Sequence, residues 1–109
     1  MIGVKEINLM KESSIFINTA RAVLVDEDAL YNALKNKRIA GAGLDVFGVE
    51  PVDSDNIFLE LDNVTVTPHA GGSTFDSEIL QSIMIAEDIE KYLNKKTPKY
   101  LNNPEVLNK

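Results

Sequence analysis

The chain has 109 residues, of which 44% are hydrophobic and 26% are charged, and its formal net charge is −6. These proportions are typical of a small globular protein and exclude a disordered polypeptide. The acidic balance argues against a nucleic-acid partner, and no apolar run approaches the roughly 20 residues that a membrane helix needs.

The sequence contains no cysteine, so it offers neither a disulfide framework nor a thiolate metal site, and we predict no metal. The amino-terminal stretch MIGVKEINLMKESS carries charges where a signal peptide would have an apolar centre. We therefore expect a cytoplasmic protein that has no contact with a membrane.

The first half of the chain alternates helical and strand-forming patterns. Apolar residues at helical spacing predict a short helix over 4–11. The apolar run SIFINT over 14–19 predicts a buried strand. Asp26 predicts the N-cap of a helix over 27–37, and IAGAGLDVF over 39–47 predicts a second buried strand.

The second half continues the alternation and then becomes polar. IFLEL over 57–61 predicts one short helical turn, and the alternating run NVTVTP over 63–68 predicts a third strand. Ser73 is the expected N-cap of a long helix that ends near Leu93. The polar tail over 95–109 contains two prolines and predicts a loop.

Buried strands that alternate with helices predict an α/β fold with a parallel sheet. In open sheets of this kind, ligands bind beyond the carboxyl ends of the strands. Three polar stretches follow the predicted strands, and they carry Arg21, Asp45 with Glu50, and His69, the only histidine. We therefore expect these side chains to meet on one rim of the sheet.

An arginine, a carboxylate and a histidine on one rim suit chemistry on a hydroxy or keto acid. A guanidinium binds a carboxylate through two parallel hydrogen bonds. An imidazole exchanges a proton with an alcohol or carbonyl oxygen, and a glutamate on its other nitrogen fixes the tautomer. Together these groups favour reversible oxidation of a 2-hydroxy acid, with hydride passing to a nicotinamide.

Each of these features also has a purely structural interpretation. A lone histidine is more often structural than catalytic, Arg21 also fits an ordinary surface arginine, and Glu50 fits a solvated loop acid. Asp45 ends an apolar strand, where a carboxylate is costly unless it caps, pairs or binds a ligand. The glycine pair after the histidine is a weak signal, because any turn can use it.

The ordered segments FINTARAVLVDEDALYNAL, IAGAGLDVFGVEP and NVTVTPHAGGST resemble the D-isomer-specific 2-hydroxyacid dehydrogenases, the family that includes D-3-phosphoglycerate dehydrogenase. The resemblance runs nearly end to end. It implies the second half of a Rossmann-type cofactor domain over residues 1–72, followed by a long interdomain helix and tail over 73–109. The GGST after the histidine favours the phosphoglycerate and glyoxylate/hydroxypyruvate branches.

The resemblance also implies roles for individual residues. Arg21 would bind the substrate carboxylate and carbonyl, His69 would be the acid/base, and Glu50 would orient His69. Asp45 would meet the nicotinamide carboxamide of an NAD cofactor. The implied cofactor-binding residues are Thr19, Ala20, Arg21, Asp45, His69, Ala70, Gly71 and Gly72.

One departure from the family pattern matters, because the G-x-G-x-x-G phosphate loop is absent from this sequence. We therefore expect a catalytic trio without a pyrophosphate site, and little NAD binding or activity by this chain alone. The implied function is part of an NAD-dependent oxidoreductase that interconverts a D-2-hydroxy acid and its 2-keto acid as a homodimer. The choice between NAD and NADP stays open.

Two other functions compete with this interpretation. In the first, the chain is a non-catalytic remnant or interaction module that self-associates through an unpaired sheet edge. In the second, His69 and Glu50 belong to a hydrolase relay with a serine nucleophile. Neither Ser73 nor Ser77 lies in a G-x-S-x-G context, which argues against the hydrolase.

Overall fold

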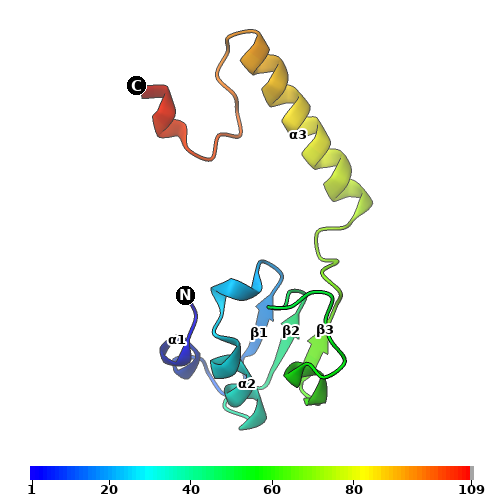
Figure 1. Ribbon diagram of the computed structural model, residues 1–109. Coiled ribbons are helices and arrows are strands. Elements are labelled where there is room, and N and C mark those ends of the chain that lie inside the picture. Colours follow the sequence, from blue (N-terminus) through cyan, green and yellow to red (C-terminus); the bar gives the residue numbers. More distant parts are fainter. Residues whose placement is uncertain (109) are drawn as a thin grey trace. The chain divides into compact units, whose positions relative to one another are not determined.

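The computed structural model describes residues 1–108, and its internal contacts divide it into two units, Met1–Gly71 and the segment from Gly72 onward. Each unit is considered by itself. The first unit contains α1 (Val4–Asn8), β1 (Ile15–Asn18), α2 (Glu27–Lys35), β2 (Gly41–Leu44) and β3 (Val64–Val66), with 3-10 turns at Ala22–Leu24 and Ile57–Glu60 (Figure 1).

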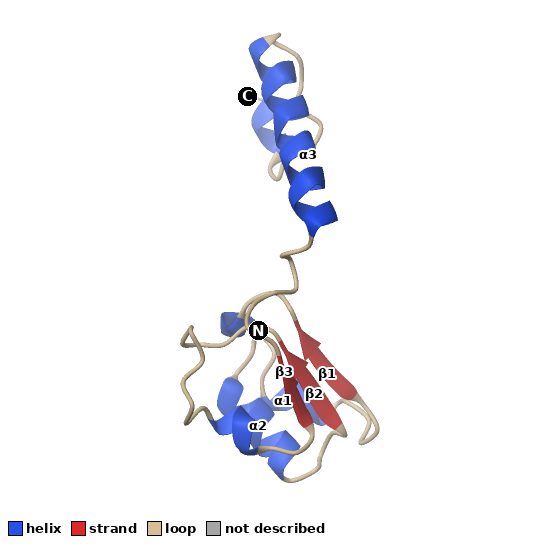
Figure 2. Cartoon of the chain, turned by 90° about the vertical axis from the view of Figure 1, so that its right-hand side faces the viewer, coloured by secondary structure: helices blue, strands red, loops and turns tan. Residues whose placement is uncertain are grey.

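The three strands form one parallel sheet in the order β1-β2-β3, which confirms the predicted α/β class. Both helices lie on one side of this sheet (Figures 1 and 2). On that side Phe16 packs against the core, whereas its neighbours Ile15 and Ile17 are 65% and 70% exposed. The alternation along β1 therefore leaves the other face of the strand uncovered.

The core of the first unit joins the helices, the sheet and one connecting turn. Its least exposed large side chains are Ile7, Leu30, Leu34, Ile39 and Phe58. Phe58 comes from the turn over Ile57–Glu60, so this predicted helical turn closes the core between β2 and β3.

Each strand occupies its predicted place but is shorter than its apolar run. The run over 39–47 forms a strand only over Gly41–Leu44, because the chain then leaves the sheet to build the loop that follows. Close packing begins at Gly41 itself, where a Cβ atom would lie 2.7 Å from the carbonyl oxygen of Asn63. A side chain at this position would collide with the backbone that leads into β3.

The second unit is built on α3 (Phe75–Leu93). None of the residues of this helix is buried. Its N-cap is Thr74, whose Oγ1 accepts a hydrogen bond from the Ser77 amide at 3.1 Å. The prediction of Ser73 as the cap was wrong by one residue, because Thr74 is the residue with extended backbone directly before the first helical turn.

The tail of the second unit is more ordered than predicted. The Asp88 carboxylate on α3 accepts hydrogen bonds from the amides of Lys99 at 2.6 Å and Tyr100 at 2.8 Å. A 3-10 turn then spans Pro104–Asn108, where the fixed φ of proline suits the first position of a helical turn. No helix in the described chain is long and apolar enough to cross a membrane.

Candidate active site

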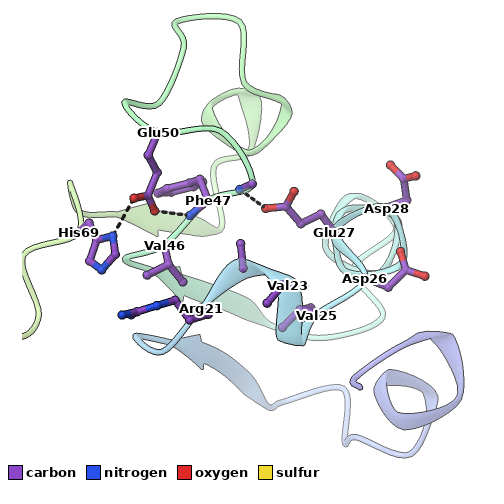
Figure 3. Close-up of a pocket in the computed structure, with 12 residues that line it drawn as sticks. Arg21, Val23, Val25, Asp26, Glu27, Asp28, Val46, Phe47, Glu50 and His69 are labelled. Atoms are coloured by element: carbon purple, nitrogen blue, oxygen red, sulfur yellow. Dashed lines mark hydrogen bonds and ion pairs between the residues drawn. The ribbon is translucent and has the colours of Figure 1, made fainter.

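The loops that follow the three strands meet at the carboxyl end of the sheet, and they bring together all three predicted catalytic side chains. Arg21 follows β1, Glu50 follows β2 and His69 follows β3. All three line one cavity of about 760 Å³, together with Val46 and Phe47 (Figure 3). Residues dispersed along the chain thus converge because parallel strands end at the same edge.

His69 and Glu50 form the closest pair in this cavity. Nδ1 of the imidazole lies 2.7 Å from Oε2 of Glu50. An ionised carboxylate only accepts hydrogen bonds, so Nδ1 carries the proton and donates it, and Nε2 is left for a ligand. The pairing fixes both the tautomer and the direction of the ring.

Glu50 is itself held by the loop that carries it. Its Oε1 accepts the Phe47 amide at 2.9 Å, and the Gly48 amide donates to Oε1 of Glu27 at 3.2 Å, which ties the loop to the start of α2. The hydrogen bond from His69 is the main reason that the pKa of Glu50 lies below its ordinary value. The Phe47 amide and the positive charges of His69 and Arg21 lower the pKa further.

Arg21 reaches the cavity from a turn that sequence reasoning did not anticipate. Asn18 is only 7% exposed, and its Oδ1 accepts the Ala20 amide at 3.0 Å while its Nδ2 donates to the Arg21 carbonyl at 3.1 Å. One guanidinium nitrogen of Arg21 donates to the Ala20 carbonyl at 2.6 Å. The signal for Asn18 was its place between an apolar strand and small residues, where asparagine forms turns.

Asp45 is 3% exposed, and its carboxylate is hydrogen-bonded to the segment around His69. Its Oδ1 accepts the Thr67 hydroxyl and, at 2.8 Å, the Ala70 amide, and its Oδ2 accepts the Gly71 amide at 2.8 Å. The Thr67 hydroxyl and then these two amides lower the pKa of Asp45, and the charge of His69 adds to the effect. The buried carboxylate therefore caps a turn.

The backbone of His69 lies in the left-handed region, with φ of 54°. A residue with a Cβ atom pays roughly 1–2 kcal/mol for this conformation. Gly71 does not have a positive φ, so backbone conformation does not account for the glycine. Lack of space does, because a Cβ atom there would lie 2.9 Å from Oδ2 of Asp45 and 3.6 Å from Cβ of Thr19. Thr19, Asp45 and Gly71, three of the predicted cofactor-binding residues, thus lie together on the rim.

The other predicted cofactor-binding residues divide between the units. Ala20 is exposed beside Arg21, and Ala70 lies next to His69 with its amide bound to Asp45. Gly72 is the first residue of the second unit. Within residues 1–108, no group of three or more histidine, cysteine, aspartate or glutamate side chains could hold a metal ion.

A parallel α/β sheet with polar loops at its carboxyl rim is the architecture of dinucleotide-binding domains. The family model of the D-isomer specific 2-hydroxyacid dehydrogenase, NAD binding domain, matches residues 1–71. This chain belongs to the D-isomer-specific 2-hydroxyacid dehydrogenase family, as its motifs predicted.

Curated relatives agree with this assignment. The glyoxylate reductase of Korarchaeum cryptofilum is 41% identical over 107 residues, which are 98% of this chain and 32% of the relative. The D-3-phosphoglycerate dehydrogenase of Methanocaldococcus jannaschii is 48% identical over 93 residues, 85% of this chain and 18% of the relative. The chain thus spans at most about a third of the length of these relatives.

Solved structures of the same family superpose on the chain. D-lactate dehydrogenase with NAD+ from Lactobacillus jensenii has a TM-score of 0.73 at 32% identity, covering 93% of this chain and 34% of that chain. The NADPH-dependent glyoxylate/hydroxypyruvate reductase from Sinorhizobium meliloti, in complex with NADP and malonate, has a TM-score of 0.70 at 30% identity. The match covers 84% of this chain and 28% of that chain. The solved structures similar to this chain therefore include one complex with NAD+ and one with NADP.

Proposed function

We propose that this chain carries the catalytic residues of an NAD-dependent dehydrogenase that interconverts a D-2-hydroxy acid and its 2-keto acid, of the phosphoglycerate or glyoxylate/hydroxypyruvate type. The observation that supports this most is the 2.7 Å contact between His69 and Glu50 in the cavity that Arg21 also lines. A pair of this kind readies Nε2 to exchange a proton with a substrate oxygen.

The roles of the three residues follow from their chemistry. Arg21 binds the carboxylate of the keto acid through its guanidinium fork and polarises the adjacent carbonyl. The nicotinamide supplies hydride to the carbonyl carbon when the cofactor is bound. His69 gives the Nε2 proton to the carbonyl oxygen, and Glu50 holds the Nδ1 proton and stabilises the imidazolium before transfer.

The rim fits the nicotinamide end of a dinucleotide. Oδ2 of Asp45 accepts one amide and so keeps a second lone pair, which suits the NH2 group of a carboxamide. Thr19, Ala20, Arg21, Ala70 and Gly71, with Gly72 and His69, complete the proposed cofactor contacts. Because the sequence holds no G-x-G-x-x-G loop, the proposal includes no activity for this chain alone and leaves the choice between NAD and NADP open.

A chimera tests the proposal. Residues 1–109 replace the matching segment of the Korarchaeum cryptofilum glyoxylate reductase, and steady-state rates are measured with NADH and glyoxylate or hydroxypyruvate, and with NAD+ and 3-phosphoglycerate. We expect turnover of at least one substrate. His69→Ala should lower kcat by roughly 10²–10⁴-fold, whereas Arg21→Ala should mainly raise KM.

Two results would contradict the proposal. The first is a folded chimera that binds NADH yet converts none of the three substrates. The second is equal kcat and KM for the chimera and its His69→Ala variant. The isolated chain serves as a control, for which we expect no NADH oxidation.

Self-association is a second candidate function, and the exposed edge strand β1 favours it. Ile15 and Ile17 are 65% and 70% exposed, and an edge strand offers unpaired backbone groups to another chain. We expect a homodimer by size-exclusion light scattering, which Ile17→Lys weakens and Leu9→Lys, a change at an exposed residue outside the sheet, leaves intact. We also propose that the protein that contains this chain is cytoplasmic.

A further inference from the structure

We propose that Asp45 is a positioning residue for His69: its buried carboxylate holds residues 69–71 in the one backbone conformation that presents the imidazole to Glu50. The inference rests on the proposed function only in that His69 is the acid/base there. It concerns how this chain builds the pair, and it adds to any contact of Asp45 with a cofactor.

The first step is the set of donors that Asp45 collects. Oδ1 accepts the Thr67 hydroxyl and the Ala70 amide, and Oδ2 accepts the Gly71 amide. These donors come from both sides of His69 in the chain. The His69 amide also donates to the Thr67 carbonyl at 3.0 Å, so the residue is fixed before and after its own Cα atom.

The second step is that Asp45 has a firm position of its own. Its backbone amide donates to the Asn18 carbonyl at 3.0 Å, which fastens it to the end of β1. Its carboxylate sits so close to Gly71 that a Cβ atom there would approach Oδ2 to 2.9 Å. The turn and the carboxylate therefore fit each other without spare room.

The third step links the turn to the catalytic pair. His69 has φ of 54°, a region that residues with a Cβ atom rarely occupy unless their surroundings impose it. In that conformation Nδ1 lies 2.7 Å from Glu50. If Asp45 releases the Ala70 and Gly71 amides, residue 69 returns to negative φ, and Nδ1 leaves the carboxylate.

Asp45→Asn is the sharpest change, because an amide has one acceptor oxygen where the carboxylate has two. The side-chain NH2 must then face either the Gly71 amide or the donors of Thr67 and Ala70. Asp53→Asn is the matched control. Asp53 is exposed, and its substitution removes the same charge from the loop that follows β2.

Nuclear magnetic resonance on the isolated chain gives two readouts, and the single histidine makes both unambiguous. The nuclear Overhauser effect between the amide proton and the Hα proton of His69 is strong only when φ is positive. Long-range correlations of the two ring nitrogens, recorded where the ring is uncharged, report which nitrogen carries the proton.

In the unchanged chain and in Asp53→Asn, we expect the strong intraresidue effect and a proton on Nδ1. In Asp45→Asn, we expect the intraresidue effect to weaken to the level of ordinary residues and the ring to become a mixture of tautomers. Glu50→Gln should lose the Nδ1 preference and keep the intraresidue effect, which separates backbone anchoring from direct pairing.

An Asp45→Asn chain that keeps its β-sheet amide shifts, its intraresidue effect and its Nδ1 proton would overturn the inference. If that variant does not fold, Thr67→Val and Gly71→Ala provide the test. In each of these variants, the intraresidue effect and the Nδ1 preference of His69 should weaken. If neither variant changes these two signals, the inference is overturned. The readouts need no turnover, so a failure of the proposed enzymatic function would leave them unchanged.

Discussion

At the scale of single residues, the rim depends on two carboxylates that act in different ways. Glu50 contacts the imidazole directly, whereas Asp45 accepts hydrogen bonds from Thr67, Ala70 and Gly71, which lie on either side of His69 in the chain. Both acids are held ionised by donors, and for this reason the pKa of each lies below its ordinary value. The turn that carries His69 is thus tied to the charge of an acid that is almost completely buried.

This arrangement predicts how stability depends on pH. Because folding lowers the pKa of Asp45 below its ordinary value of 3.8, the stability that this group contributes is complete at higher pH. It is lost as the pH falls below 3.8 and through the lowered pKa of the folded state. We expect Asp45→Asn to have a lower Tm at neutral pH and a shallower fall of Tm in acid.

Thermal unfolding followed by circular dichroism over the acid range checks this expectation, with Asp53→Asn as the control for loss of one charge. Parallel Tm curves for the Asp45→Asn variant and the unchanged chain would show that the Asp45 carboxylate contributes nothing that depends on its ionisation.

The sequence predicted which charged and polar side chains meet at the rim better than it predicted the residues that hold them there. Arg21, Glu50 and His69 follow strands, and topology alone brings strand ends together. The supports Asn18 and Thr67 act through short local bonds whose partners only the folded loops define. The sequence left open whether the Asp45 carboxylate caps a turn, pairs with a charge or binds a ligand. The structure shows that it caps the turn over residues 69–71.

At the scale of elements, β2 begins with a glycine because the backbone that leads into β3 lies unusually close to Gly41. A Cβ atom at Gly41 would meet the Asn63 carbonyl oxygen at 2.7 Å, and backbone cannot move aside as a side chain can. We expect Gly41→Ala to lower the free energy of unfolding by about 1–3 kcal/mol.

Urea denaturation of the chain measures this effect, and Gly72→Ala is the matched control. A Cβ at Gly72 would meet nothing within 4 Å, so its substitution should change stability by no more than about 0.5 kcal/mol. Equal effects of the two substitutions would mean that β2 and the entry to β3 are not in close contact.

The start of α3 allows a second test at this scale. Thr74→Ala removes the side-chain oxygen that accepts the Ser77 amide, and we expect the first turn of the helix to fray at a cost of about 0.5–2 kcal/mol. Carbon chemical shifts over residues 75–78 report the fraying. Ser73→Ala should leave these shifts unchanged, and the reverse pattern would restore Ser73 as the cap.

At the scale of the whole molecule, periodicity and strand spacing predicted the order of elements and the parallel sheet, and the resemblance of the ordered motifs predicted the family. They could not predict where each strand stops, because apolar runs continue into the loops that build the rim. They also missed that the tail folds back on α3 through Asp88, since this contact joins residues that no local pattern links.

Both units leave apolar side chains exposed. The first unit carries Arg21, Glu50 and His69 on a sheet of three strands, one face of which is exposed along β1. No residue of α3 in the second unit is buried. The three predicted catalytic side chains therefore lie on a scaffold that still presents apolar surface for further packing.

The pH profile of kcat/KM for glyoxylate reduction by the chimera tests the central claim most directly. Reduction takes a proton from the imidazole, and the ionised Glu50, whose pKa is lowered chiefly by the hydrogen bond from His69, stabilises the imidazolium that gives this proton up. We predict that Glu50→Gln lowers kcat/KM and changes its dependence on pH. A profile that keeps its shape and position in Glu50→Gln would contradict the claim that Glu50 and His69 work as one acid–base pair.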